Sequence, residues 1–168
     1  MPEEQMKIYG RQATAMPEDE RAAEEFRRQT ENGNLARAHV LGQRVCKRFL
    51  DMPVTGPYAA QQWVLLSYLV QSLLEQELTH PLWQDSAKSE FAKALDTADS
   101  ALSRTIHDSR AFTLYTLNEN RLRSRSEGAV FAGLCEHSGD AALIACGDRL
   151  AQDFTRAVRE EIAQVDFV

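Results

Sequence analysis

The spacing of apolar residues predicts helices along most of this chain. Apolar positions recur at three- and four-residue steps, which places them on one face of a helix with 3.6 residues per turn. One such stripe begins after Asn34, and another runs for about six turns near the end of the sequence. The first consists of Leu35, Ala38, Leu41, Val45, Phe49 and Met52, and the second of Leu143, Gly147, Leu150, Phe154, Val158, Ile162 and Val165.

The segment from Trp63 to Leu74 is apolar on nearly every helical face. A helix of this kind is contacted by neighbours on several sides, so we expect a helix over about 58–79 to lie at the centre of the fold. Gln62 and Glu75 bound the apolar segment, which is shorter than the about 20 residues that a membrane span requires. The sequence therefore predicts no membrane association.

Proline, glycine and capping residues predict where the helices begin and end. Pro17 precedes three acidic residues, which favours a helix start, and Gly33 ends that helix. Asn34 is expected to cap the next helix, and Pro81 to end the central one. After it, a single seam with alternating four- and three-residue spacing predicts one helix, with the apolar residues Phe91, Leu95, Ala98, Leu102 and Ile106.

The sequence leaves the structure of two segments undecided. Residues 1–16 are weakly patterned, and the sequence does not decide whether this N-terminal arm is ordered. Residues 111–117 have the aromatic and β-branched content of a strand as well as helical spacing. Because an isolated strand would leave its backbone groups unpaired, we favour a short helix that starts at Ser109 and is capped by Asp108.

These patterns together predict an all-α protein, with residues 17–168 as a single-domain bundle of six or seven helices. The chain has 168 residues, which is near the usual size of one domain. No internal repeat or low-complexity linker divides it.

Net charge limits the classes of partner. The formal charge is −6, which disfavours binding to nucleic acid or to anionic lipid, since both require clustered cations. A local basic patch is still compatible with this charge. The first residues lack the basic and apolar regions of a secretory signal, so we expect a soluble, cytoplasmic protein. The odd number of cysteines favours free thiols, and we expect all three, Cys46, Cys135 and Cys146, to be small core residues.

No motif in the sequence demands a particular reaction. We find no nucleophile elbow, no phosphate-binding loop and no dinucleotide fingerprint. The Cys135-Glu-His137 spacing does not form a paired zinc motif, and the single Glu77-Leu-Thr-His80 pair lacks the further ligands of a di-iron site. We therefore predict no metal, no cofactor and no catalytic residues.

One cluster suggests an anion site. Arg121, Arg123 and Arg125 precede Ser126, which opens a predicted helix. Free backbone N–H groups at a helix N-terminus favour an anion, and guanidinium groups bind phosphates and carboxylates. Exposed arginines that pair with surface carboxylates are the simpler interpretation.

The leading functional hypothesis is a noncatalytic helical module that binds a protein partner or a second copy of itself. Ile8, Tyr9, Leu82 and Trp83 are apolar residues in breaks or in the arm, where a partner could reach them. They could equally well close the ends of the core. The alternative is an anion-binding protein, a small-ligand protein or an enzyme with a pocket between helices. Such a pocket could be lined by Tyr58, Tyr68 and Tyr115 together with the arginine cluster.

Overall fold

The computed structural model describes residues 17–120 and 125–168, which are all-α. The described residues form eight helices, one more than the upper number that the sequence predicted. They are α1 (Glu18–Glu31), α2 (Asn34–Leu50), α3 (Ala59–Glu77), α4 (Pro81–Ala98), α5 (Ser100–His107), α6 (Phe112–Asn120), α7 (Glu127–Leu134) and α8 (Ala141–Ala163).

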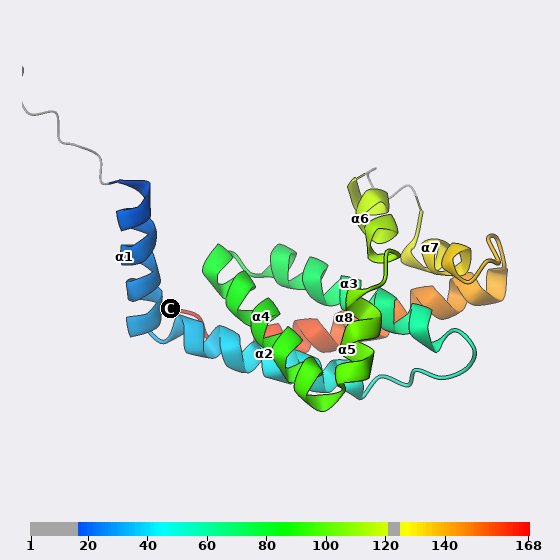
Figure 1. The fold of residues 1–168 in the computed structure, drawn as a ribbon, viewed down its shortest axis with the longest axis horizontal. Helices are drawn as coiled ribbons and strands as arrows, with labels where there is room; N and C mark the ends of the chain where they lie inside the picture. Colours follow the sequence, from blue (N-terminus) through cyan, green and yellow to red (C-terminus); the bar gives the residue numbers. More distant parts are fainter. Residues whose placement is uncertain (1–16, 121–124) are drawn as a thin grey trace, which may run out of the picture.

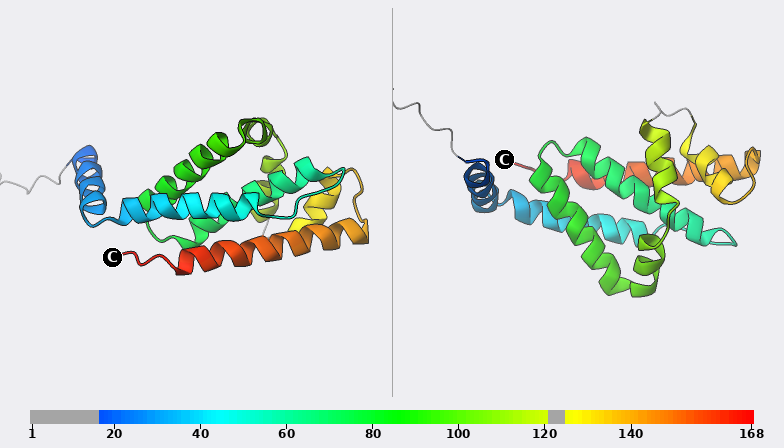
Figure 2. Two further views of the ribbon diagram at one scale, coloured as in Figure 1. Left: turned by 90° about the horizontal axis from the view of Figure 1, so that it is seen from below. Right: turned by 45° about the horizontal axis from the view of Figure 1, so that its top comes forward.

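Helix α3 lies at the centre of the bundle, as its sequence predicted. Every residue from Val64 to Val70 is buried, because α4, α7 and α8 pack on different sides of the helix. The long helices α2 and α8 run along the bundle together, and α4 crosses α2 (Figure 2). The phenyl ring of Phe49 on α2 meets Phe91 and Phe154, with ring centroids 5.3 and 6.2 Å away.

Two glycines allow α7 to approach α8 closely. A Cβ atom at Gly128 would lie 2.1 Å from the carbonyl oxygen of Ile144, and one at Gly147 would lie 2.8 Å from the Cα atom of Gly128. There is no room for a side chain at either position, so the close packing of α7 on α8 depends on both glycines.

The predicted single helix through Phe91 and Ile106 is divided in the structure. Asp99 leaves the helical conformation (φ −152°, ψ 88°), and its carboxylate accepts a hydrogen bond of 2.9 Å from the N–H group of Leu102. This side-chain cap starts α5 and lets the chain change direction without losing the alternating apolar spacing. Pro81 begins α4 at its first position, whereas α3 ends earlier, at Glu77.

Two predictions about helix starts were wrong. Asn34 is the first residue of α2 and does not cap it; Gly33 precedes the helix in the left-handed region (φ +80°). Asp108 is the C-cap of α5 and does not cap α6, which starts at Phe112. The open segment 111–117 is helical from Phe112 onward, because aromatic packing against α3 supplies the stabilisation that its weak pattern lacks.

Helix α1 stands away from the rest of the bundle, nearly across the direction of α2 (Figure 1). Gln29 is its only buried residue. Among the described residues, no helix combines the length and the apolar character needed to cross a membrane.

Candidate functional site

The predicted anion-binding residues are only partly described. Arg121 and Arg123 lie outside the described residues, whereas Arg125 and Ser126 lie directly before α7. The hydroxyl of Ser126 accepts a hydrogen bond of 3.1 Å from the N–H group of Ala129, as expected of a capping residue. The same hydroxyl donates to the Asp148 carboxylate on α8 at 3.2 Å.

Asp148 occupies the position where an external anion would bind to α7. Its second carboxylate oxygen accepts a hydrogen bond of 2.7 Å from the N–H group of Gly128. A carboxylate of the protein itself therefore complements the N-terminal end of this helix. Anion binding by the arginine cluster stays a prediction, and it would have to use donors other than this N–H group.

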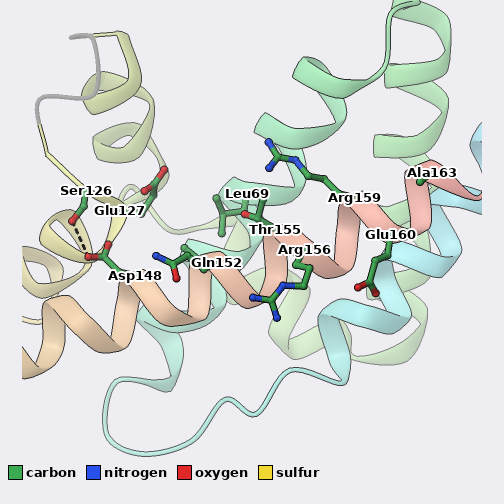
Figure 3. Close-up of a pocket in the computed structure, with 11 residues that line it drawn as sticks. Leu69, Ser126, Glu127, Asp148, Gln152, Thr155, Arg156, Arg159, Glu160 and Ala163 are labelled. Atoms are coloured by element: carbon green, nitrogen blue, oxygen red, sulfur yellow. Dashed lines mark hydrogen bonds between the residues drawn. The ribbon is translucent and has the colours of Figure 1, made fainter.

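A hollow of about 780 Å³ lies along α8 and ends at Ser126 and Asp148 (Figure 3). Side chains of both charges line it. Arg159 donates a hydrogen bond of 2.8 Å to Glu77, and Arg156 lies 3.7 Å from Asp153. Because each of these arginines already has a carboxylate neighbour, the hollow holds no concentrated charge of one sign.

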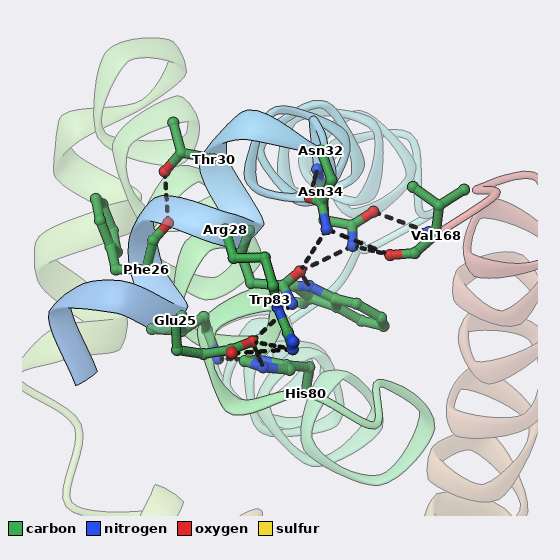
Figure 4. A network of polar contacts seen from close by, with 11 residues as sticks. Glu25, Phe26, Arg28, Thr30, Asn32, Asn34, His80, Trp83 and Val168 are labelled. Atoms are coloured by element: carbon green, nitrogen blue, oxygen red, sulfur yellow. Dashed lines mark hydrogen bonds and ion pairs between the residues drawn. The ribbon is translucent and has the colours of Figure 1, made fainter. Parts of the chain in front are cut away.

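A cluster of polar side chains attaches α1 to the bundle (Figure 4). The side-chain oxygen of Gln29 accepts hydrogen bonds from the indole N–H group of Trp83 at 2.9 Å and from the amide group of Asn34 at 2.8 Å. Its amide group donates to Glu25 at 2.8 Å. The buried Gln29 thus joins α1 to both α2 and α4.

His80 makes the second connection of this cluster. Its Nδ1 atom accepts a hydrogen bond of 3.1 Å from the N–H group of Leu82 and so caps α4. Nδ1 is therefore unprotonated, and the Nε2 atom, 2.9 Å from the Glu25 carboxylate, is the donor. Hydrogen bonds from Gln29, His80 and Arg28 lower the pKa of Glu25, with that from Gln29 as the largest cause.

The last residues of the chain complete the cluster. Asn34 is fully buried and exchanges two hydrogen bonds with the backbone of Val168. The ring of Phe167 stacks on the indole of Trp83, with centroids 4.2 Å apart. The sequence left open whether Trp83 and Leu82 are exposed to a partner or close the end of the core. Both are half-buried, and Phe167 covers Trp83; Ile8 and Tyr9 lie outside the described residues.

Attachment by Gln29 and Glu25 leaves an apolar stripe of α1 uncovered. Ala22, Ala23 and Phe26 lie on one face of the helix and are exposed, Phe26 to 55%. The Phe26 ring points away from the polar cluster (Figure 4). The spacing of Ala22, Ala23 and Phe26 could have indicated an apolar face from the sequence alone. It could not have indicated that the bundle leaves this face uncovered.

A second apolar feature that the described residues leave uncovered lies between α6 and α7. These two helices are at the end of the bundle far from α1 (Figure 1). The feature is a groove of about 530 Å³, with Arg125 and Asn118 as its polar residues. We call it the α6–α7 groove. The apolar lining consists of Leu114, Leu117, Ala129, Val130, Gly133 and Leu134.

A polar contact with α3 determines which face of α6 is outward. The Tyr68 hydroxyl and the side chains of Ser72 and Gln76 donate hydrogen bonds to the Glu119 carboxylate. Burial, and then the bond to Glu119, raise the pKa of Tyr68, so the phenol remains a donor. Tyr115 stacks on Tyr68 with centroids 5.1 Å apart.

With that face of α6 held against α3, Leu114 and Leu117 are left in solvent, exposed to 49% and 45%. Tyr68 and Tyr115, suggested from sequence as pocket residues, are buried structural side chains.

The described residues offer little reactive chemistry. No group of three or more His, Cys, Asp or Glu residues among them is arranged to hold a metal ion. Cys46 and Cys135 are buried, and burial raises the pKa of both thiols. Cys146 is exposed, which corrects the expectation that it lies in the core. It falls beside the stripe of α8 that includes Gly147 and Leu150, and therefore faces outward.

Comparison with known proteins assigns no class to the chain. No protein-family model, no curated protein and no solved structure matches it.

Proposed function

We propose that the chain is a noncatalytic helical module that binds a protein chain through α1. The observation that carries this proposal is the exposure of the apolar stripe of α1, with Phe26 as its one large side chain. An isolated helix of this length is marginal in water, and most helices gain their stability by packing an apolar face. A partner that covers the stripe would supply that packing.

The attachment of α1 supports the same interpretation. Gln29 and Glu25 hold the helix through hydrogen bonds to Trp83, Asn34 and His80, which place it in a defined direction. A helix that is fixed in direction but uncovered presents a preorganised surface, which reduces the entropy lost on binding. The arrangement therefore favours recognition through a helix face.

The test is a native mass spectrum of the tagged protein, purified gently from its own host. Wild type is compared with Phe26→Glu and with the control Glu24→Gln, which changes an exposed charge outside the stripe. We expect wild type and Glu24→Gln to carry an additional protein chain, either a second copy or another protein, and Phe26→Glu to lose it. A mass spectrum that is the same for all three proteins would contradict the proposal.

A second candidate function is the binding of a small anionic ligand, with Arg125 before α7 and Arg156 and Arg159 at the hollow along α8 as the cationic side chains. Acidic residues line the same hollow, so a ligand there would have to replace Glu77 or Asp153 as the neighbour of these arginines. Thermal shift with phosphate and with nucleotides tests this alternative on wild type, on Arg156→Ala and on the double variant Arg123→Ala, Arg125→Ala. A ligand-dependent rise in Tm that either variant abolishes would support it, and no rise in wild type would exclude it for these ligands.

A further inference from the structure

We infer that the partner of α1 is a second copy of this chain, and that two copies form a reciprocal dimer in which each α1 lies in the α6–α7 groove of the other. This inference rests on the proposed role of α1 and adds the identity of its partner. It unites two uncovered apolar features of the described residues in one interface.

The shapes of the two features are compatible. The α1 stripe offers one large side chain, Phe26, one helical turn after the small residues Ala22 and Ala23. The α6–α7 groove provides about 530 Å³ between Leu114 and Leu117 on one side and α7 on the other. A single phenyl ring beside two small residues suits a helix face that binds in an apolar groove.

The charges are complementary as well. Arg125 is exposed at the groove, and no salt bridge joins it to another described residue. Asp19 lies one helical turn before Ala22 and Ala23, on the same face of α1. With Phe26 in the groove, the Asp19 carboxylate is available to Arg125 of the second copy, and such a pair fixes the direction of the docked helix.

The two features lie too far apart to meet within one chain. Helix α1 and helix α6 are at opposite ends of the bundle (Figure 1), so α1 does not reach the groove of its own chain. In the proposed dimer, a two-fold axis relates each α1 to the groove of the other copy. Closed two-fold dimers are the commonest oligomers, and two equal contacts strengthen each other.

The experiment measures dimerisation by native mass spectrometry and by light scattering on a sizing column. We expect wild type to be a dimer, and both Phe26→Glu and Leu117→Arg to raise the dissociation constant by roughly 100-fold, because each damages two contacts per dimer. Both residues are exposed, so circular dichroism and Tm should show an intact fold. Val40→Arg, a control at an exposed apolar residue of α2, should remain dimeric.

Mixing the two variants tests reciprocity. A reciprocal dimer predicts that Phe26→Glu and Leu117→Arg form a heterodimer, since that pair retains one unaltered contact and places the introduced glutamate opposite the introduced arginine. Two monomeric variants that remain monomeric when mixed would overturn the inference, as would a wild-type polymer.

Two outcomes separate this inference from the proposed function. If only Phe26→Glu disrupts the dimer, α1 pairs with another surface; the inference then fails, and the role of α1 stands. In the second outcome, purified wild type is monomeric, but wild type isolated from its host carries another protein that Phe26→Glu removes. The partner is then not a second copy, and the inference again fails alone. If Phe26→Glu changes neither assembly, both fail.

Discussion

The indole ring of Trp83 and the phenyl ring of Phe167 lie almost parallel, with an angle of 9° between their planes and 4.2 Å between their centroids. This contact joins the start of α4 to the last residues of the chain. Since the same indole donates a hydrogen bond to Gln29, the end of the sequence helps to hold α1, near its beginning.

Replacing Phe167 by Ala should therefore loosen α1. We expect a loss of about 1–2 kcal/mol in the free energy of unfolding, from the lost ring stacking and apolar burial. Hydrogen exchange should accelerate in the backbone amides of α1 more than in those of α3. Equal exchange in α1 of the variant and wild type would show that the tail does not hold this helix.

Removing the hydroxyl of Tyr68 and removing that of Tyr115 should have opposite effects on the stability of the protein, although the two rings stack on each other. Tyr68 donates to Glu119, so Tyr68→Phe should cost about 1.5–3 kcal/mol. The Tyr115 hydroxyl is buried and has no hydrogen-bond partner among the described residues, so Tyr115→Phe should be neutral or stabilising by about 1 kcal/mol. Urea unfolding measures both, and a large loss for Tyr115→Phe would reveal a partner for this hydroxyl.

The glycines of α7 should differ sharply in their tolerance of a methyl group. Gly128→Ala places a Cβ atom against the carbonyl oxygen of Ile144 and should destabilise the protein by about 1–3 kcal/mol or more. At Gly133, the nearest atom to such a Cβ is 3.4 Å away, so Gly133→Ala should stabilise by up to about 1 kcal/mol. Thermal unfolding compares the two, and equal Tm values would contradict the close packing of α7 on α8.

The three thiols should react in a fixed order. Cys146 is exposed, whereas Cys46 and Cys135 are buried and have raised pKa values, which reduces their thiolate fraction. Brief treatment with iodoacetamide at pH 8, followed by peptide mass spectrometry, should find the label on Cys146 first. Early labelling of Cys46 would mean that the core around α2 opens readily.

Glu25 should make the stability depend on pH in the acidic range. Its pKa is lower in the folded protein, so its stabilisation is present above the ordinary value of about 4.3 and is lost as the pH falls through the folded-state pKa. We expect urea unfolding to give Glu25→Gln a lower free energy of unfolding than wild type at pH 7. The two free energies should converge toward pH 3. A difference that does not change with pH would exclude a role for the Glu25 charge.

Most of the fold could be predicted because helices are local structures. The apolar spacing of α2 and α8, the continuous apolar run of α3 and the capping residue Ser126 each act within a few residues of the chain. The division of α4 from α5 escaped prediction, because Asp99 breaks the backbone without interrupting the apolar spacing.

The candidate site could be predicted only in part. The arginine cluster was visible as a sequence motif, but the Asp148 carboxylate that meets the start of α7 is 20 residues from Gly128. The exposure of Phe26, Leu114 and Leu117 is likewise decided by what packs elsewhere. An apolar stripe has the same spacing whether a neighbouring helix covers it or not.

The sequence by itself therefore determined that this protein is all-α, the approximate position of most of its helices, and that α3 is central, since these depend on local spacing and capping. Only the tertiary structure decided that Asn34 binds Val168, that Trp83 is covered by Phe167, and that the other described residues leave α1 and the α6–α7 groove uncovered. These contacts join residues distant in the sequence, and their geometry depends on how all the helices pack together.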